Sequence, residues 1–147
     1  MGLSSAFTSA THENANGPQI IGALWKEVSQ KFFALESSMG LDPVGIGAMW
    51  PSESGVPQEM VYFAGFEVAE FPAAAVGLDT LSLNAARYAV LEHSGTIAEL
   101  PDVIRSFYSD LLPKSGFKRA IGMDLEIYHP ADLGNGMGRV ELAAPIA

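Results

Sequence analysis

The residues of this sequence that could do chemistry gather in one short segment, Asp124-Leu-Glu-Ile-Tyr128. Side chains alternate across a strand, so Glu126 and Tyr128 share one face, and Leu125 and Ile127 share the other. Leu125 and Ile127 can satisfy a hydrophobic core, which leaves Glu126 pointing either into solvent or into a ligand cleft. Burial in a cleft destabilises a carboxylate anion by up to about 3–5 pKa units, and a cationic ligand would remove that penalty.

Aromatic side chains could form the walls of such a cleft, because the face of an aromatic ring attracts a cation by about 0.5–2 kcal/mol. The candidate residues are Trp25, Trp50, Tyr62, Phe66, Phe107, Tyr108 and Tyr128. Ordinary core packing is the commoner role for such residues. For Trp25 and Tyr108, which fall on the two predicted helices, the core and the pocket roles are both open.

Other constellations indicate no further chemistry. The three histidines are not at metal-ligand spacing and cysteine is absent, so we expect neither a metal nor a cofactor. His93-Ser94 lacks the G-x-S-x-G turn of a serine hydrolase, which argues against that class. Gly45-Ile-Gly47 precedes a strand end rather than a helix, which removes the argument for a phosphate cradle.

Composition narrows the function classes. The chain has 147 residues, of which 48% are hydrophobic and 17% charged, typical of one folded domain. Seventeen acids against eight bases give a net charge of −9, so no direct nucleic-acid binding is expected. No apolar run approaches the ~20 residues of a membrane span, and no signal peptide is evident. We therefore expect a soluble cytoplasmic protein.

Two helices and six strands must position these residues. Apolar stripes at helical spacing predict one helix from Pro18 to about Gly40 and another over 100–111. Thr96 and Glu99 have capping-box spacing, and Pro113 with Gly116 marks the second helix end. Strands are predicted over 3–11, 44–50, 59–68, 86–93, 124–129 and 139–146, with a short helix possible over 70–83.

The order strand-helix-strand-strand therefore occurs twice, over about 1–69 and 84–147. An offset of 79 carries Trp50-Pro51 onto His129-Pro130 and Val61 onto Val140, so we infer an internal duplication. The predicted fold is α+β: one domain over 1–147, with an antiparallel sheet and two main helices on one side. A ligand cleft is expected along the pseudo-twofold axis between the helices.

Several strings resemble the GyrI-like small-molecule-binding domains, a superfamily that includes the effector-binding domains of AraC-type and MerR-type multidrug regulators. The matching strings are LW at 24–25, YFAGFEV at 62–68, LNAARYAVLEHSG at 83–95, LLPKSG at 111–116, DLEIY at 124–128 and VELAAPI at 140–146. They occur in the family's order and cover nearly the whole chain. Leu111 stands where the family usually has a tryptophan, which makes that part of the pocket wall smaller.

The resemblance implies a cleft between two helices and a pocket glutamate that meets cationic, aromatic ligands. That glutamate maps onto Glu126, and Tyr128, Trp25, Tyr108, Tyr62 and Trp50 map onto the surrounding wall, with Phe66 and Phe107 as further candidates. The resemblance therefore favours a stand-alone binding protein for cationic or hydrophobic, drug-like molecules.

Two alternatives remain open. Some proteins resembling this family hydrolyse cyclopropane-containing compounds, and Glu126 would then be the catalytic residue. Others are described as inhibitors of DNA gyrase, so the third possibility is an interaction module with a protein partner, either a transcription regulator or a topoisomerase.

Overall fold

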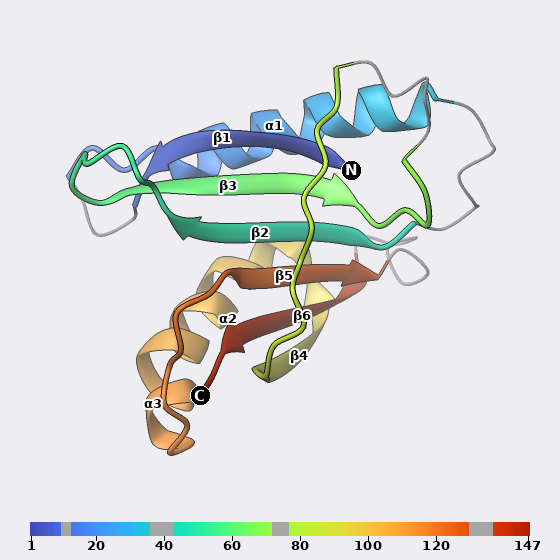
Figure 1. Ribbon diagram of the computed structural model, residues 1–147. Helices are drawn as coiled ribbons and strands as arrows, with labels where there is room; N and C mark the ends of the chain where they lie inside the picture. The colour runs from blue at the N-terminus through green and yellow to red at the C-terminus, as the bar shows by residue number, and fades with distance from the viewer. Residues whose placement is uncertain (10–12, 36–42, 72–76, 130–136) are drawn as a thin grey trace. The chain divides into compact units, whose positions relative to one another are not determined.

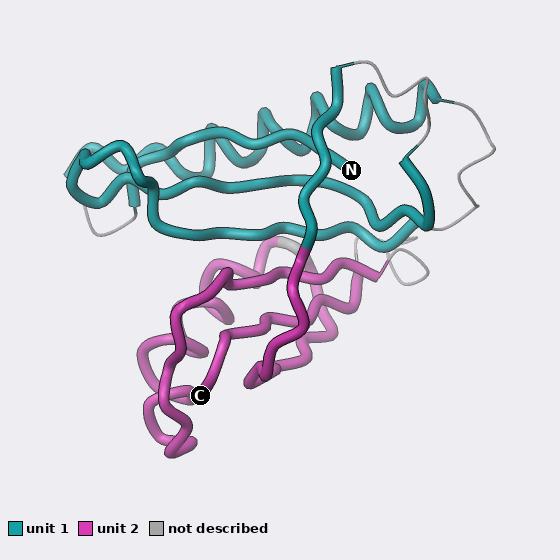
Figure 2. The backbone as a smooth tube through the Cα atoms, in the orientation of Figure 1, with its two compact units in different colours: residues 1–82 teal, residues 83–147 magenta. Residues whose placement is uncertain are grey.

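The computed structural model describes residues 1–9, 13–35, 43–71, 77–129 and 137–147. The chain divides into two compact units, unit 1 (Met1–Ser82) and unit 2 (Leu83–Ala147), which are coloured separately in Figure 2. That the two halves act as one domain, and that a cleft lies between their helices, stay predictions.

Unit 1 is a three-stranded antiparallel sheet with one long helix. Its described elements are β1 (Gly2–Thr8), α1 (Gly17–Phe33), β2 (Gly45–Pro51) and β3 (Glu59–Phe66). The strand β3 lies between the other two and is antiparallel to both (Figure 1). Pro18 lies in the first turn of α1 as predicted, where its missing N–H costs no hydrogen bond. The predicted helix end at Gly40 lies outside the described residues.

Unit 2 repeats this order with a more irregular helix. Its elements are β4 (Tyr88–Thr96), a 3-10 turn (Ile97–Glu99), α2 (Leu100–Ser106), a π-helical turn (Phe107–Leu111), α3 (Leu112–Lys114), β5 (Asp124–His129) and β6 (Met137–Pro145). Here β6 lies between β4 and β5 and is antiparallel to both. The α+β class and the duplicated strand-helix-strand-strand order are therefore confirmed.

Each unit has its own core between its helix and one face of its sheet. In unit 1, Tyr62, Ala64 and Phe66 of β3 pack with apolar residues of α1, among them Leu24, Val28 and Phe32. In unit 2 the corresponding core consists of Ala89, Leu100, Phe107, Leu112, Val140, Leu142, Ala144 and Ile146. Alternate residues of each central strand thus face the helix, as the period of two along a strand requires.

The repeat is real, but a single offset of 79 is wrong for its last strand. Trp50 pairs with Val61, whereas Val140 pairs with Tyr128 rather than with His129. An offset of 79 relates β2 to β5, and an offset of 78 relates β3 to β6. A slip of one residue exchanges the two faces of a strand. Val61 and Val140 are the same residue type but lie on opposite faces of their sheets, so matching them by residue type concealed the slip.

The second helix also departs from the prediction of one continuous α-helix. The N–H of Leu112 bonds to the carbonyl of Phe107, five residues back, which defines the π-helical turn. Pro113 lies just beyond it and has no N–H to offer the carbonyl of Ser109, so one regular α-helical hydrogen bond is missing there. The predicted capping contact is present, since the N–H of Thr96 donates to Glu99 Oε2 at 2.9 Å.

The segment joining the halves, predicted to hold a short helix, contains none in its described part, which is 70–71 and 77–83. Instead, Asp79 forms an isolated antiparallel bridge with Gly2. In the described parts of the chain, no helix is both long and apolar enough to cross a membrane.

Two valines test the assignment of faces in unit 2. Val140 is 2% exposed in the core, and Val90, on the opposite face, is 55% exposed. We expect Val140→Ala to lower the free energy of unfolding by about 2 kcal/mol, because it removes buried methyl groups and leaves a cavity. Val90→Ala should change it by less than about 0.5 kcal/mol. Urea unfolding followed by circular dichroism measures both, and equal losses would mean that the assignment is wrong.

Candidate functional site

Glu126 and Tyr128 lie together on the helix-facing side of β5. The Tyr128 hydroxyl donates a hydrogen bond to Glu126 Oε2 at 2.8 Å, and both side chains are half-buried. Glu126 is paired in register with Leu142, and Tyr128 with Val140, and both of these partners belong to the core of unit 2. Tyr128 itself packs against that core. The carboxylate is therefore on the apolar face of the sheet.

Leu125 and Ile127, which were expected to satisfy a hydrophobic core, lie on the face of β5 that the helix does not cover. Ile127 is paired with Glu141, on the face of the sheet opposite to Glu126. Leu125 shares that face and is nevertheless buried, at 7% exposure. Alternation along the strand correctly predicts which residues share a face, but it does not predict which of the two faces the helix covers.

A second charged group lies beside this pair. Asp124 precedes Glu126 by two residues, so both carboxylates belong to the same face of β5. Arg119 binds Asp124 through two parallel hydrogen bonds, Nη1 to Oδ1 at 2.6 Å and Nη2 to Oδ2 at 2.9 Å. The Arg119 Cζ also lies 5.4 Å from the centre of the Tyr108 ring, within the range of a cation–π contact.

Tyr108 and Phe107 come from the π-helical turn and have different environments. Phe107 is 4% exposed and belongs to the core, so for this candidate the structure shows core packing. Tyr108 packs edge-on against Phe107, with 4.9 Å between ring centres, and also reaches Arg119. Burial raises the pKa of Tyr108, and the negative charge of Asp124 raises it further, while Arg119 acts in the opposite direction.

Three of the candidate aromatic residues meet in unit 1. Trp25 Nε1 donates a hydrogen bond to the Tyr62 hydroxyl at 3.1 Å, and the Trp25 and Phe66 rings meet edge to face at 5.9 Å. Tyr62 and Phe66 are buried in the core of unit 1, and Trp25 is partly buried against it. All three residues therefore pack in the core of unit 1, and Trp25 remains partly exposed.

Trp50 does not join this group. It is paired with Val61, and neighbouring positions of β3 alternate in direction, so Trp50 lies on the face of the sheet opposite to Tyr62 and α1. Its position corresponds to His129 in unit 2, whose side chain also lies on the face away from the helix.

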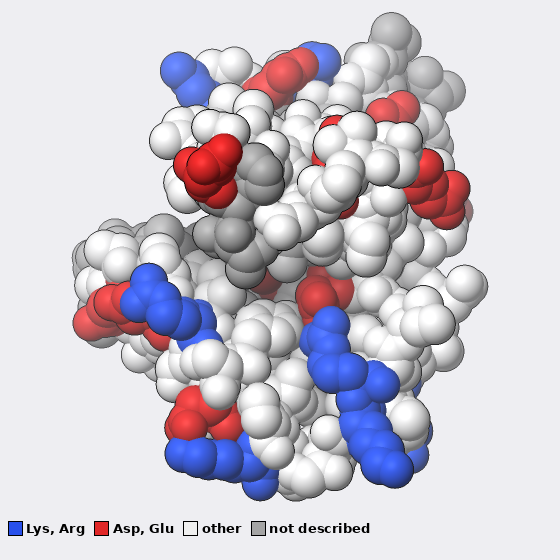
Figure 3. All heavy atoms as spheres, turned by 90° about the vertical axis from the view of Figure 1, so that its left-hand side faces the viewer, with Lys and Arg blue, Asp and Glu red and all other residues white. Residues whose placement is uncertain are grey.

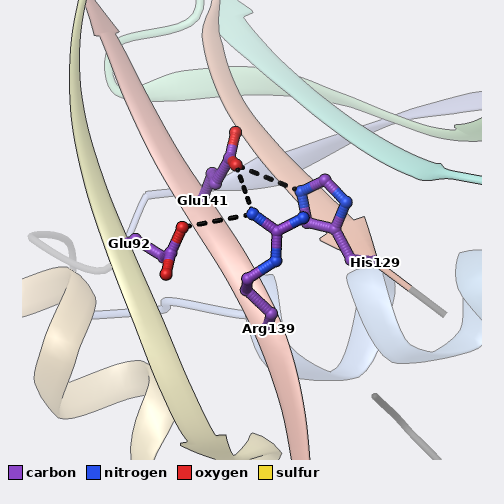
Figure 4. Close-up of polar contacts among 4 residues, drawn as sticks. All are labelled: Glu92, His129, Arg139 and Glu141. Atoms are coloured by element: carbon purple, nitrogen blue, oxygen red, sulfur yellow. Dashed lines mark hydrogen bonds and ion pairs between the residues drawn. The ribbon is translucent and has the colours of Figure 1, made fainter. Parts of the chain in front are cut away.

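That face of unit 2 carries a polar network that the sequence analysis missed (Figure 4). Arg139 Nη1 donates to Glu92 Oε2 at 3.1 Å and to Glu141 Oε1 at 3.0 Å. His129 Nε2 lies 3.2 Å from the same Glu141 oxygen. Arg139, the first Lys or Arg that follows Glu126 in the sequence, is therefore engaged on the other side of the sheet. The sequence did contain a signal for this network. Glu92 lies in one predicted strand, and Arg139 and Glu141 occupy alternate positions of another.

Charge is distributed unevenly between the units. Unit 1 has two bases and nine acids, whereas unit 2 has six bases and eight acids. In unit 2 the basic side chains gather next to acidic ones (Figure 3). The ion pairs among its described residues include Arg105–Asp102, Lys114–Asp110, Arg119–Asp124, Arg139–Glu92 and Arg139–Glu141. Much of the positive charge of unit 2 is therefore neutralised locally.

No group of three or more His, Cys, Asp or Glu residues is arranged to hold a metal ion within the ranges that the structure describes. The functional groups that the structure places around Glu126 are two neighbouring carboxylates, two phenols and one guanidinium.

The raised pKa of Tyr108 predicts a dependence of stability on alkaline pH. The folded state holds the phenol proton more tightly than the unfolded chain, whose tyrosines titrate near 10.0. The resulting stability is fully present below that pH and is lost as the pH rises above it. Tyr108→Phe should therefore show a shallower fall in unfolding free energy between about pH 9.5 and 11 than the unaltered chain. Urea unfolding at several pH values measures the slopes, and identical slopes would contradict this prediction.

Comparison with known proteins agrees with the duplicated fold. The fold resembles that in "The structure of SAV2435 bound to tetraphenylphosphonium", with a TM-score of 0.71 and 15% sequence identity, over 99% of this chain and 86% of that one. The chain is also similar to the transcriptional regulator BrlR of Pseudomonas aeruginosa, with 32% identity over 133 residues. That match covers 86% of this chain but 46% of the relative, so the chain spans about half the length of the curated relative.

The short sequence motifs noted above agree with a comparison against protein families, in which one family matches nearly the whole chain. Residues 6–147 match the family described as the GyrI-like small molecule binding domain. Both units, with their repeated strand-helix-strand-strand order, lie within that match. The chain therefore belongs to the GyrI-like small-molecule-binding domain family.

Proposed function

We propose that this chain binds organic cations with apolar bodies, and that the Glu126 carboxylate is the counter-ion for the bound positive charge. The observation that carries this proposal is the position of the Glu126–Tyr128 pair on the helix-facing side of β5. A carboxylate beside apolar core residues loses part of its hydration, and a cation bound next to it compensates for that loss.

Tyr128 supports this role of Glu126. Its hydroxyl donates to one carboxylate oxygen and so restricts the orientation of the side chain. A phenol is a neutral donor, so this contact orients the carboxylate without cancelling its negative charge. A group held in this way can meet a ligand cation at little cost in side-chain entropy.

The comparisons support the choice of ligand class. The family is one of small-molecule-binding domains, and the structurally similar SAV2435 was determined with tetraphenylphosphonium, a cation surrounded by four phenyl rings. The aromatic residues already described are compatible with such a ligand, because phenyl groups pack well against aromatic side chains. Hydrolysis by Glu126, a protein partner and a cytoplasmic location stay predictions.

The substitution Glu126→Gln tests the electrostatic part of the proposal, since it removes the charge and keeps the size. We expect the affinity for tetraphenylphosphonium to fall about tenfold or more, equivalent to about 1.4 kcal/mol. The affinity for triphenylphosphine oxide, a neutral relative of that probe, should change by less than about twofold. Isothermal titration calorimetry at fixed ionic strength measures both.

The matched control is Glu92→Gln, which makes the same change of charge on the opposite face of the sheet, at a side chain that is 56% exposed. It should leave both affinities within about twofold of the unaltered chain, because an exposed charge is screened by solvent and salt. Equal losses for the two variants, or equal losses for the two probes, would reject Glu126 as the counter-ion.

A further inference from the structure

Arg119 sits in surroundings suited to a ligand cation. Its guanidinium makes two hydrogen bonds to Asp124, and its Cζ lies 5.4 Å from the centre of the Tyr108 ring. A carboxylate together with an aromatic ring is the combination that recognises quaternary ammonium groups and guanidinium groups alike. The protein's own side chain therefore occupies a place where an external cation could be held.

We propose that Asp124 and Tyr108 form a second cation subsite next to Glu126, and that the Arg119 side chain occupies it as a displaceable internal competitor. This inference rests on the proposed function, since it concerns the same bound cation. It adds that Arg119 limits the affinity of this face of unit 2 for organic cations.

The location of Arg119 allows such displacement. It lies in the connection between α3 and β5, where its backbone is tied to the end of the chain by a bridge to Ile146. Its side chain is 43% exposed, whereas that of Asp124 is 16% exposed. The side chain can therefore turn into water while the backbone stays in place, giving up its two hydrogen bonds to Asp124.

Asp124 is close enough to Glu126 for the competition between Arg119 and a ligand cation to affect binding at Glu126. Successive residues on one face of a strand are about 7 Å apart, so Asp124 and Glu126 act on the same bound ligand. With Arg119 in place, the charge of Asp124 is neutralised. When Arg119 turns away, two negative charges and one face of the Tyr108 ring become available together.

The substitution Arg119→Met tests the proposal, because it removes the charge and keeps an apolar stem of similar length. The cation probe is benzyltrimethylammonium, and its neutral isostere is 2,2-dimethylpropylbenzene. We expect Arg119→Met to tighten binding of the cation about three- to tenfold and to leave the neutral probe within about twofold. Adding Asp124→Asn to Arg119→Met should return the affinity for the cation to within about twofold of the unaltered chain.

The control is Arg105→Met, which removes the same charge from α2, where Arg105 pairs with Asp102 and is 74% exposed. It should leave cation binding within about twofold. If Arg119→Met, with its fold intact by circular dichroism, leaves cation binding unchanged or weakens it, or if Arg105→Met tightens binding equally, the proposal is wrong.

A measurement on the unaltered chain keeps the test independent of the variant's folding. Titration with benzyltrimethylammonium should move the Arg119 Nε–H resonance toward that of a solvated arginine, and no movement at saturation would overturn the proposal. Failure of the proposed function has a different signature, since there Glu126→Gln leaves cation affinity unchanged whatever Arg119→Met does.

Discussion

The pairing register between β5 and β6 is the constraint on which the candidate site depends. It sets Tyr128 opposite Val140 and Glu126 opposite Leu142, and so commits one carboxylate and one phenol to the face that the helix of unit 2 covers. A slip of one residue would exchange every side chain of β5 between the two faces. Glu126 would then share a face with the polar network of Arg139, where its charge would meet other charged groups rather than apolar ones.

The duplication provides two similar frames, but only one carries this chemistry. The positions in β2 that correspond to Glu126 and Tyr128 are Gly47 and Met49, which pair with Ala64 and Tyr62. A glycine and a methionine there offer neither charge nor a hydroxyl, and Tyr62, the partner of Met49 in β3, accepts a hydrogen bond from Trp25 instead. The two halves therefore share a backbone plan and differ in their side-chain chemistry at these positions, where only β5 has a carboxylate and a phenol.

The irregular helix of unit 2 has a physical cause that connects it to the site. Pro113 interrupts the regular hydrogen bonding, and the resulting π-helical turn contains both Phe107 and Tyr108. Phe107 is buried in the core, while Tyr108 packs against it and extends to Arg119. Aromatic residues adjacent in sequence thus serve in packing and in an electrostatic contact, a division that an apolar stripe at helical spacing does not reveal.

The sequence alone determined the order of the elements, the duplication, the family resemblance and the fact that Glu126 and Tyr128 share a face, because these depend on local periodicity and on strings of adjacent residues. Only the tertiary structure decided that this face is the helix-covered one, that Trp50 lies away from Trp25 and Tyr62, and that Arg119 binds Asp124 and Tyr108. Those outcomes depend on strand register and on contacts between residues far apart in the chain. Alternation is the same for both faces of a strand, so it does not by itself specify which face the helix covers.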